Sequence, residues 1–143
     1  MAALDTNILV RWLTDDDKKQ SAIVARLLES TANNSERLFV TVTVMLETEW
    51  VLRCRYRFDK PSVTAALDAL LSVTELEFQT EPALEQALWR YKQAGAPDFA
   101  DCLHLALVSQ AGQGPLLTFD ERASKLDGAQ LLFNSTSIDD RLK

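Results

Sequence analysis

The chain has 143 residues, 47% of them hydrophobic, and a formal net charge of −6. This length matches one domain with a buried core, whereas the negative charge excludes loose electrostatic binding to nucleic acid, which needs many Lys and Arg side chains. No internal repeat, low-complexity tract or linker divides the sequence, so we expect one continuous domain over residues 1–143.

Short apolar runs alternate with longer stretches of helical periodicity along the whole chain. The apolar runs lie at 2–4, 38–40, 76–78, 116–119 and 131–133. The helical stretches lie at 7–13, 17–31, 43–57, 60–72, 81–94 and 98–111, with a short helix after Asp120. Capping residues support three of these starts, at Asp59, Thr80 and Asp98. The alternation predicts an α/β fold with a parallel sheet and helices on both of its faces.

Membrane, secretion and zinc signals are missing from this sequence. No apolar run reaches the roughly 18 residues that cross a bilayer, and the first ten residues lack a positive leader and a cleavage site. We therefore expect a soluble, cytoplasmic protein. Cys54 and Cys102 form no CxxC pair and have no His partners at zinc spacing, so we expect reduced, packed thiols.

Four carboxylates follow or begin the predicted elements in a way that can bring them together. Asp5 ends the first strand and Asp120 follows the run at 116–119, so both would emerge at the carboxyl edge of a parallel sheet, where α/β folds bind ligands. Glu47 and Asp101 lie in the first turns of their helices and can face the same edge. Crowded carboxylates repel each other, which raises at least one pKa, and a hard cation such as Mg²⁺ or Mn²⁺ relieves the repulsion.

Each of these acids also has an ordinary structural interpretation. Asp5 and Asp120 can cap the helices that follow them, Asp98 and Asp101 form an acidic helix start, and Glu47 can be an exposed surface residue. Taken by spacing alone, a metal site and a set of helix caps both explain the pattern. The metal site is favoured because an acid directly follows each of two apolar runs, Asp5 after the first and Asp120 after the run at 116–119.

Four segments resemble, in order, the signature blocks of the PIN-domain ribonucleases and most closely the VapC-like toxins of bacterial toxin–antitoxin systems. They are LDTNILVRWL at 4–13, VMLETEWVLRCRY at 44–56, PDFADCLHLAL at 97–107 and LLTFDERASKL at 116–126. The resemblance implies a three-layer α/β/α sandwich around a parallel sheet of four or five strands. It also implies Mg²⁺-dependent endoribonuclease activity, with Mn²⁺ as a substitute, that leaves 5′-phosphate and 3′-hydroxyl ends.

The resemblance also assigns roles to individual residues. The metal-binding and catalytic acids of the family fall on Asp5, Glu47, Asp101 and Asp120, and Asp98 is a possible fifth ligand. Thr6, Asn7 and Thr118 match polar positions that support the first and last acids by hydrogen bonding. The implied partners are an RNA substrate, in particular tRNA or rRNA, a cognate antitoxin and a second copy of the chain in a homodimer.

Several other charged and aromatic residues could contribute to the site or could have ordinary structural roles. Basic clusters at 18–19 and at Arg53, Arg55 and Arg57 could contact RNA, although solvated helix faces also explain them. His104 shares a helix side with Asp101 and could be a ligand or a base. The acidic run at 15–17 lacks EF-hand spacing and is interpreted as a turn and helix start. Core packing is the interpretation for the three tryptophans, Trp12, Trp50 and Trp89.

Two other functions remain as alternatives. An inactive PIN-like module would dimerise or bind partners without cleaving RNA. A phosphohydrolase could use Asp5 as its nucleophile, but position 7 is Asn and so lacks the second acid that such enzymes use for proton transfer.

Overall fold

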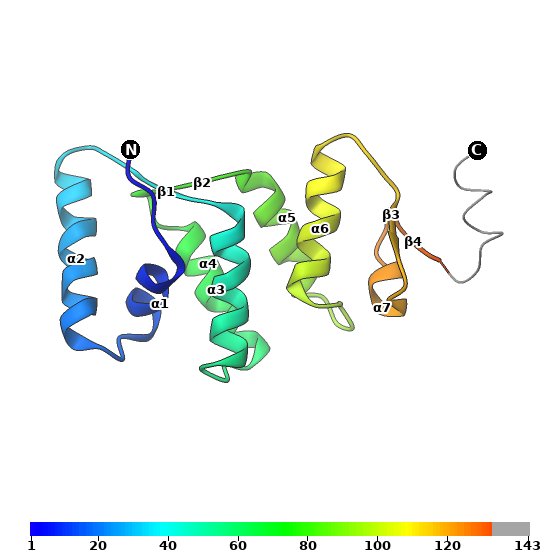
Figure 1. The fold of residues 1–143 in the computed structure, drawn as a ribbon, viewed down its shortest axis with the longest axis horizontal. Coiled ribbons are helices and arrows are strands. Elements are labelled where there is room, and N and C mark those ends of the chain that lie inside the picture. The colour runs from blue at the N-terminus through cyan, green and yellow to red at the C-terminus, as the bar shows by residue number, and fades with distance from the viewer. Residues whose placement is uncertain (133–143) are drawn as a thin grey trace. The chain divides into compact units, whose positions relative to one another are not determined.

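The computed structural model describes residues 1–132, which form two compact units: Met1–Glu81, and Pro82 onward. The first unit contains α1 (Thr6–Thr14), α2 (Lys18–Asn33), β1 (Leu38–Val40), α3 (Val42–Cys54), α4 (Lys60–Leu71) and β2 (Leu76–Phe78) (Figure 1). The second contains α5 (Glu81–Tyr91), α6 (Phe99–Gln110), β3 (Leu116–Thr118), α7 (Glu121–Ser124) and β4 (Ala129–Leu131). The boundary between the units falls after Glu81, the first residue of α5.

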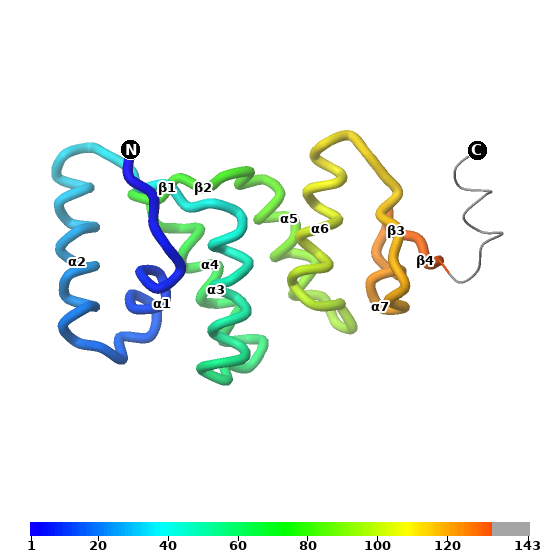
Figure 2. The backbone as a smooth tube through the Cα atoms, in the orientation of Figure 1, coloured from blue at the N-terminus to red at the C-terminus, as the bar shows by residue number. Residues whose placement is uncertain are grey.

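The strands of the first unit are parallel and adjacent in chain order. β1 pairs with β2 from Leu38↔Leu76 to Val40↔Phe78, and the amino-terminal segment joins the other side of β1 through a parallel bridge between Ala3 and Phe39. Figure 2 shows this segment entering beside β1 before it turns into α1. Because the strands are parallel, the residues that follow each strand lie at one edge.

Three helices of the first unit, α2, α3 and α4, begin where a polar side chain accepts a hydrogen bond from the first turn. Asp17 accepts from Gln20 N at 3.1 Å and Asp59 from Ser62 N at 2.9 Å. Thr41 caps α3 through Val44 N, at 3.3 Å. These bonds satisfy backbone N–H groups that have no partner inside the helix, which explains why the helices start at these residues.

Buried apolar side chains lie on the helix faces and strands of each unit. In the first unit they include Leu9, Val10, Val40, Met45, Leu52, Val63, Leu67 and Leu70. In the second they include Ala83, Leu84, Ala87, Phe99, Cys102, Leu103 and Ala106. Within residues 1–132, no helix combines the length and the apolar character that a membrane crossing requires.

The α/β class and the parallel strand pairs predicted from the sequence are confirmed. Two local predictions were wrong. The last strand is 129–131 rather than 131–133, whose final residue lies outside the described part, because Gly128 (φ 98°) turns the chain and Ala129 already pairs with Leu116. Thr80 has φ 49°, and its hydroxyl donates to the Gln79 carbonyl at 2.7 Å instead of capping α5.

The second unit pairs β3 with β4 in parallel, from Leu116↔Ala129 to Thr118↔Leu131. The described residues therefore contain two parallel strand pairs plus the bridge at Ala3. A single central sheet of four or five strands, and a single domain over residues 1–143, stay predictions.

Candidate functional site

A pocket of about 380 Å³ opens in the first unit, between the start of α1 and the face of α3. Within the described part of the chain, its lining residues belong to two segments, residues 5–11 and 47–56. The lining residues are Asp5, Thr6, Asn7, Val10, Arg11, Glu47, Trp50, Val51, Arg55 and Tyr56. It brings together two of the four predicted acids, Asp5 and Glu47.

Thr6 connects the two acids of this pocket. Its backbone N–H donates to Asp5 Oδ1 at 2.7 Å, and its hydroxyl donates to Glu47 Oε1. Thr6 is buried, whereas Asp5 and Glu47 remain exposed to solvent. The buried threonine therefore orients both carboxylates while leaving oxygen atoms of each open to a ligand.

The local sequence explains why these acids meet. Asp5 follows the amino-terminal strand segment directly and caps α1, and Glu47 lies in the second turn of α3, which begins two residues after β1. The amino-terminal segment and β1 are parallel neighbours, so both helices start at the same edge, and α1 packs against α3. Asn7 also lines this pocket, from the first turn of α1.

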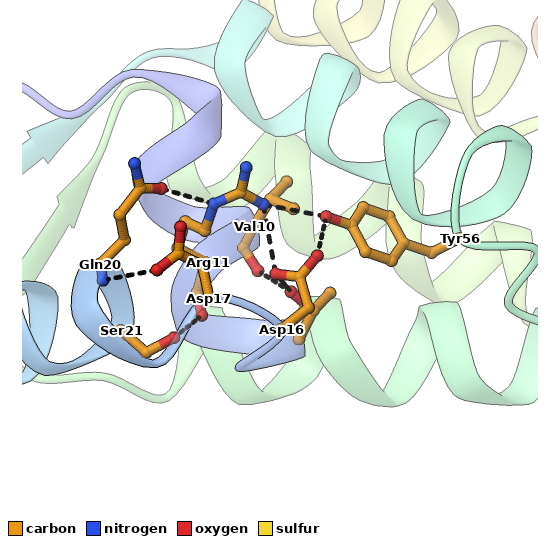
Figure 3. A network of polar contacts seen from close by, with 8 residues as sticks. Val10, Arg11, Asp16, Asp17, Gln20, Ser21 and Tyr56 are labelled. Atoms are coloured by element: carbon orange, nitrogen blue, oxygen red, sulfur yellow. Dashed lines mark hydrogen bonds and ion pairs between the residues drawn. The ribbon is translucent and has the colours of Figure 1, made fainter.

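Arg11 and Tyr56 line the pocket and belong to one polar network (Figure 3). Arg11 Nη1 donates to Tyr56 Oη at 3.0 Å and to Asp16 Oδ1 at 3.2 Å, and its Nε donates to Gln20 Oε1 at 2.6 Å. Tyr56 donates in turn to Asp16 Oδ2 at 2.8 Å. This hydrogen bond, followed by one from Thr14, lowers the pKa of Asp16. The network ties the end of α3 to α1 and α2.

The acidic run at 15–17 is a turn and helix start, as predicted. Asp15 ends α1 in a left-handed conformation with φ 52°, Asp16 belongs to the Arg11 network, and Asp17 caps α2. Each of the three carboxylates thus has a structural role.

Arg53 pairs with a buried carboxylate that the sequence did not single out. Its Nε lies 2.8 Å from Glu49 Oε2 and its Nη2 lies 3.3 Å from Glu49 Oε1, while only 2% of the Glu49 side chain is exposed. A buried carboxylate needs such a partner because its desolvation is costly. Arg53 therefore has a structural partner, which sets it apart from Arg55 and Arg57.

We expect Arg53→Met to lower the free energy of unfolding by about 1–3 kcal/mol, because Glu49 loses a charge-assisted hydrogen-bonding partner in a buried position. Urea unfolding at neutral pH measures this loss. The matched control is Arg57→Met, an exposed residue just beyond the same helix, which should change stability by less than about 0.5 kcal/mol. Equal stability of the two variants would contradict a structural role for the Glu49–Arg53 pair.

The core-packing interpretation was wrong for two tryptophans. Trp50 is 46% exposed and Trp89 is 65% exposed, whereas Trp12 is half-buried. Trp50 lines the pocket, and the Arg55 guanidinium lies 5.8 Å from the centre of its ring. Arg55 and Arg57 are both exposed, but of the two only Arg55 lines the pocket.

The second unit holds the other predicted acids at the start of α6 and after β3. Asp101 is half-buried in the first turn of α6, and Asp120 caps α7 by accepting from Ala123 N at 3.0 Å. Thr118 Oγ1 accepts from Asp120 N at 3.0 Å, so the last residue of β3 fixes the backbone of this acid. Asp98 stands at the N-cap position of α6 but makes no side-chain capping bond.

The acids of this unit act on one another electrostatically. Burial raises the pKa of Asp101, the charge of Asp120 raises it further, and Asp98 adds to the increase, whereas His104 opposes it. Asp101 and Asp120 are therefore close enough to repel each other. The pKa of Asp101 is thus raised first by burial and then by acids of its own unit, whereas crowding of all four predicted acids stays a prediction.

The donor atoms of both units suit a hard divalent cation. Asp5, Glu47, Asp101 and Asp120 offer only carboxylate oxygen, which Mg²⁺ and Mn²⁺ prefer as a ligand. Within residues 1–132, no three His, Cys, Asp or Glu side chains form a group that could hold a metal ion. Each unit contributes two of the four acids.

Sequence reasoning missed Arg11, Tyr56 and Glu49. Arg11 is four residues after Asn7, so helical spacing places both on one side of α1, and this signal was available. Tyr56 is 45 residues from Arg11 and Glu49 is buried by tertiary packing, so no local pattern points to either.

The chain is similar to known proteins along most of its length. The family model described as "PIN domain" matches residues 2–129. The "VapC ribonuclease" of Aquifex aeolicus (strain VF5) is 25% identical over 127 residues, covering 88% of this chain and 92% of that protein. The crystal structure of Mycobacterium tuberculosis VapC20, described as a sarcin-ricin loop cleaving toxin, covers 97% of this chain and 95% of its own, with 19% identity and a TM-score of 0.41. Because the family model spans most of its length, the chain belongs to the PIN domain family.

Proposed function

We propose that this chain is an endoribonuclease in which Asp5, Glu47, Asp101 and Asp120 together hold a divalent cation, Mg²⁺ with Mn²⁺ as a substitute. The proposal includes the association of the two units into one nuclease domain. It is supported by membership of the PIN family and by similarity to a VapC ribonuclease along most of both chains.

The observation that carries the proposal is the group formed by Asp5, Thr6 and Glu47. Two carboxylates that are 42 positions apart open into one pocket, and a buried threonine hydrogen-bonds to both. Helix capping explains the position of Asp5. It does not explain why Glu47 accepts a hydrogen bond from Thr6, the residue that also donates to Asp5. The arrangement instead matches ligands whose orientation is fixed by neighbouring hydrogen bonds.

The cation and the residues of the chain would have different roles in the cleavage reaction. When bound, the cation would supply Lewis-acid stabilisation of the charge that develops on the phosphodiester. Thr6 holds the Glu47 carboxylate, and Thr118 holds the backbone of Asp120. Asp98, which lacks a capping bond, is a further oxygen donor near Asp101. No side-chain nucleophile is needed for hydrolysis of this kind.

A direct test uses the purified full chain and an end-labelled RNA. Cleavage should stop in the presence of a chelator and return on addition of Mg²⁺ or Mn²⁺. A chain that never cleaves under either condition would support the inactive module. Activity on small phosphomonoesters without RNA cleavage would support the phosphohydrolase.

The proposed biological setting is a toxin–antitoxin pair with tRNA or rRNA loops as targets. Loops present unpaired nucleotides that can enter a small pocket. A cognate antitoxin could inhibit by placing an Arg side chain against the uncompensated carboxylates, because a guanidinium pairs well with them. A purified partner that leaves cleavage unchanged at saturating concentration would contradict this mode of inhibition.

We also expect a homodimer, since the resemblance implies pairing through helices and a symmetric interface is the commonest arrangement. Light scattering at micromolar concentration should give about twice the 16.0 kDa mass of the chain. A single species at the monomer mass over that concentration range would contradict the expectation.

A further inference from the structure

Trp50 and Arg55 form an exposed pair on the wall of the pocket that holds Asp5 and Glu47. The Arg55 guanidinium lies 5.8 Å from the centre of the Trp50 ring, and 46% of Trp50 is exposed. A large aromatic side chain left in water at a pocket wall does not serve core packing, and its exposed part is accessible to a ligand.

In the part of the chain that the structure describes, Arg55 differs from Arg11 and Arg53 because neither of their ion pairs has a counterpart at Arg55. Arg11 pairs with Asp16 at 3.2 Å, and Arg53 pairs with Glu49 at 2.8 Å. Within the described range 1–132, Arg55 forms no ion pair, and its guanidinium lies over the Trp50 ring. In a chain of net charge −6, this pocket arginine is therefore available to an anion.

The Arg11 network holds the end of α3 that carries this arginine. Tyr56, the next residue, is bonded to both Arg11 and Asp16, and the Arg55 backbone N–H donates to Val51 O at 2.8 Å. The Trp50–Arg55 pair thus stands on an anchored segment, which reduces the entropy lost when a ligand binds.

We propose that the Trp50–Arg55 pair binds one unpaired nucleotide of the RNA, with the base stacked on Trp50 and the phosphate against Arg55. This inference rests on the proposed function. Aromatic and guanidinium planes stack on unpaired bases, and arginine pairs with phosphate. The pair would place a nucleotide next to Asp5 and Glu47, so it is a positioning and selectivity element for the same site.

The size and charge of the pocket favour one nucleotide over a duplex. Its volume of about 380 Å³ is near the lower end of small-molecule pockets, roughly 300–1,000 Å³. A duplex is bound through many phosphates along a broad basic surface, and the net charge of −6 does not provide one. A single-stranded region or loop supplies the required base without strand separation.

The test measures binding of a short labelled single-stranded RNA of mixed sequence to the full chain, in chelator, so that no cleavage occurs. Trp50→Leu should weaken binding by about 5- to 150-fold, the range for loss of one stacked base. Arg55→Gln should weaken binding and reduce the slope of log affinity against log salt by about 0.7, the value for one phosphate contact on a single strand. A duplex of the same sequence should bind more weakly than the single strand.

Arg57→Gln is the matched control, because it removes the same charge two residues away and outside the pocket. Equal effects of Arg55→Gln and Arg57→Gln, or wild-type affinity in Trp50→Leu, would overturn the inference and leave the pair open to a protein partner instead. If the wild-type chain cleaves RNA with Mg²⁺ while these variants bind normally, only this inference fails. If the wild-type chain neither binds nor cleaves RNA, the proposed function fails with it.

Discussion

Asp5→Asn is expected to reduce RNA cleavage by more than about 100-fold while the protein stays folded. Loss of an outer-shell partner of a metal ligand typically costs about 10–100-fold, and a ligand itself should cost more. Folding should be retained because Asn is as good an N-cap as Asp and can accept the Thr6 N–H bond that starts α1. The measurement is the initial rate of cleavage of a labelled RNA with Mg²⁺, beside a thermal melt in chelator.

The matched control for this substitution is Asp17→Asn. Asp17 caps the next helix through Gln20 N at 3.1 Å and lies outside the lining of the pocket. It should keep both wild-type cleavage and wild-type stability. If Asp5→Asn cleaves as fast as Asp17→Asn, Asp5 is a helix cap and not a central ligand.

Asp101→Asn is expected to make the metal-free protein more stable than wild type at neutral pH. The pKa of Asp101 is raised above its ordinary 3.8 by burial and then by Asp120, so the folded state binds its proton more tightly than the unfolded state does. Wild-type stability therefore falls as the pH rises from about 3.8 through the raised pKa. The variant has no carboxyl group to ionise in that range, so its advantage over wild type should vanish below pH 3.8 and be complete above the folded pKa.

Urea unfolding over a pH series in chelator measures this difference, and Asp127→Asn serves as a control because it changes an exposed carboxylate of the same unit. The control should differ from wild type by less than about 0.5 kcal/mol at every pH. A difference between Asp101→Asn and wild type that does not depend on pH would contradict the raised pKa as its cause. Asp101→Asn should also lose RNA cleavage. A variant that is more stable but inactive would show that Asp101 serves function at a cost to stability.

Helix starts and strand ends could be predicted because their chemistry is local. Asp5 and Asp120 cap helices, which the sequence offered as the alternative to a metal site, and the parallel strands at 38–40 and 76–78 coincide with the apolar runs. Asp98 occupies the predicted N-cap position without making the capping bond. The same local patterns therefore placed all four candidate acids near helix starts, but they could not show which side chains have unused oxygen atoms.

Burial within a helix was harder to predict, because apolar character does not decide which face turns inward. In α3 the buried side chains are Met45, Thr48, Glu49 and Leu52, a helical face that includes two polar residues. Trp50 lies off this face and reaches the pocket instead. Glu49 is stabilised there by Arg53, a partner on the next turn, and no local pattern in the sequence marked this acid as buried.

Long-range polar contacts are the other part that the sequence could not supply. The bond from Thr6 to Glu47 joins positions 41 residues apart, and the Arg11–Tyr56 bond joins positions 45 apart. Both depend on the packing of α1 against α3, which in turn follows from parallel pairing of the first two strand segments. The family resemblance pointed to Thr6, whereas Arg11 and Tyr56 emerged only from the structure.

We propose that acids from both units form one cation site, and Mg²⁺ titration by calorimetry tests this proposal most directly. The proteins compared are wild type, Asp5→Asn from the first unit, Asp101→Asn from the second and the Asp17→Asn control. One shared site predicts that either site variant alone removes most of the Mg²⁺ binding, together with the Mg²⁺-dependent rise in melting temperature, while the control keeps both. Each site variant retaining half of the bound Mg²⁺ at undiminished affinity would show two independent sites and contradict the claim.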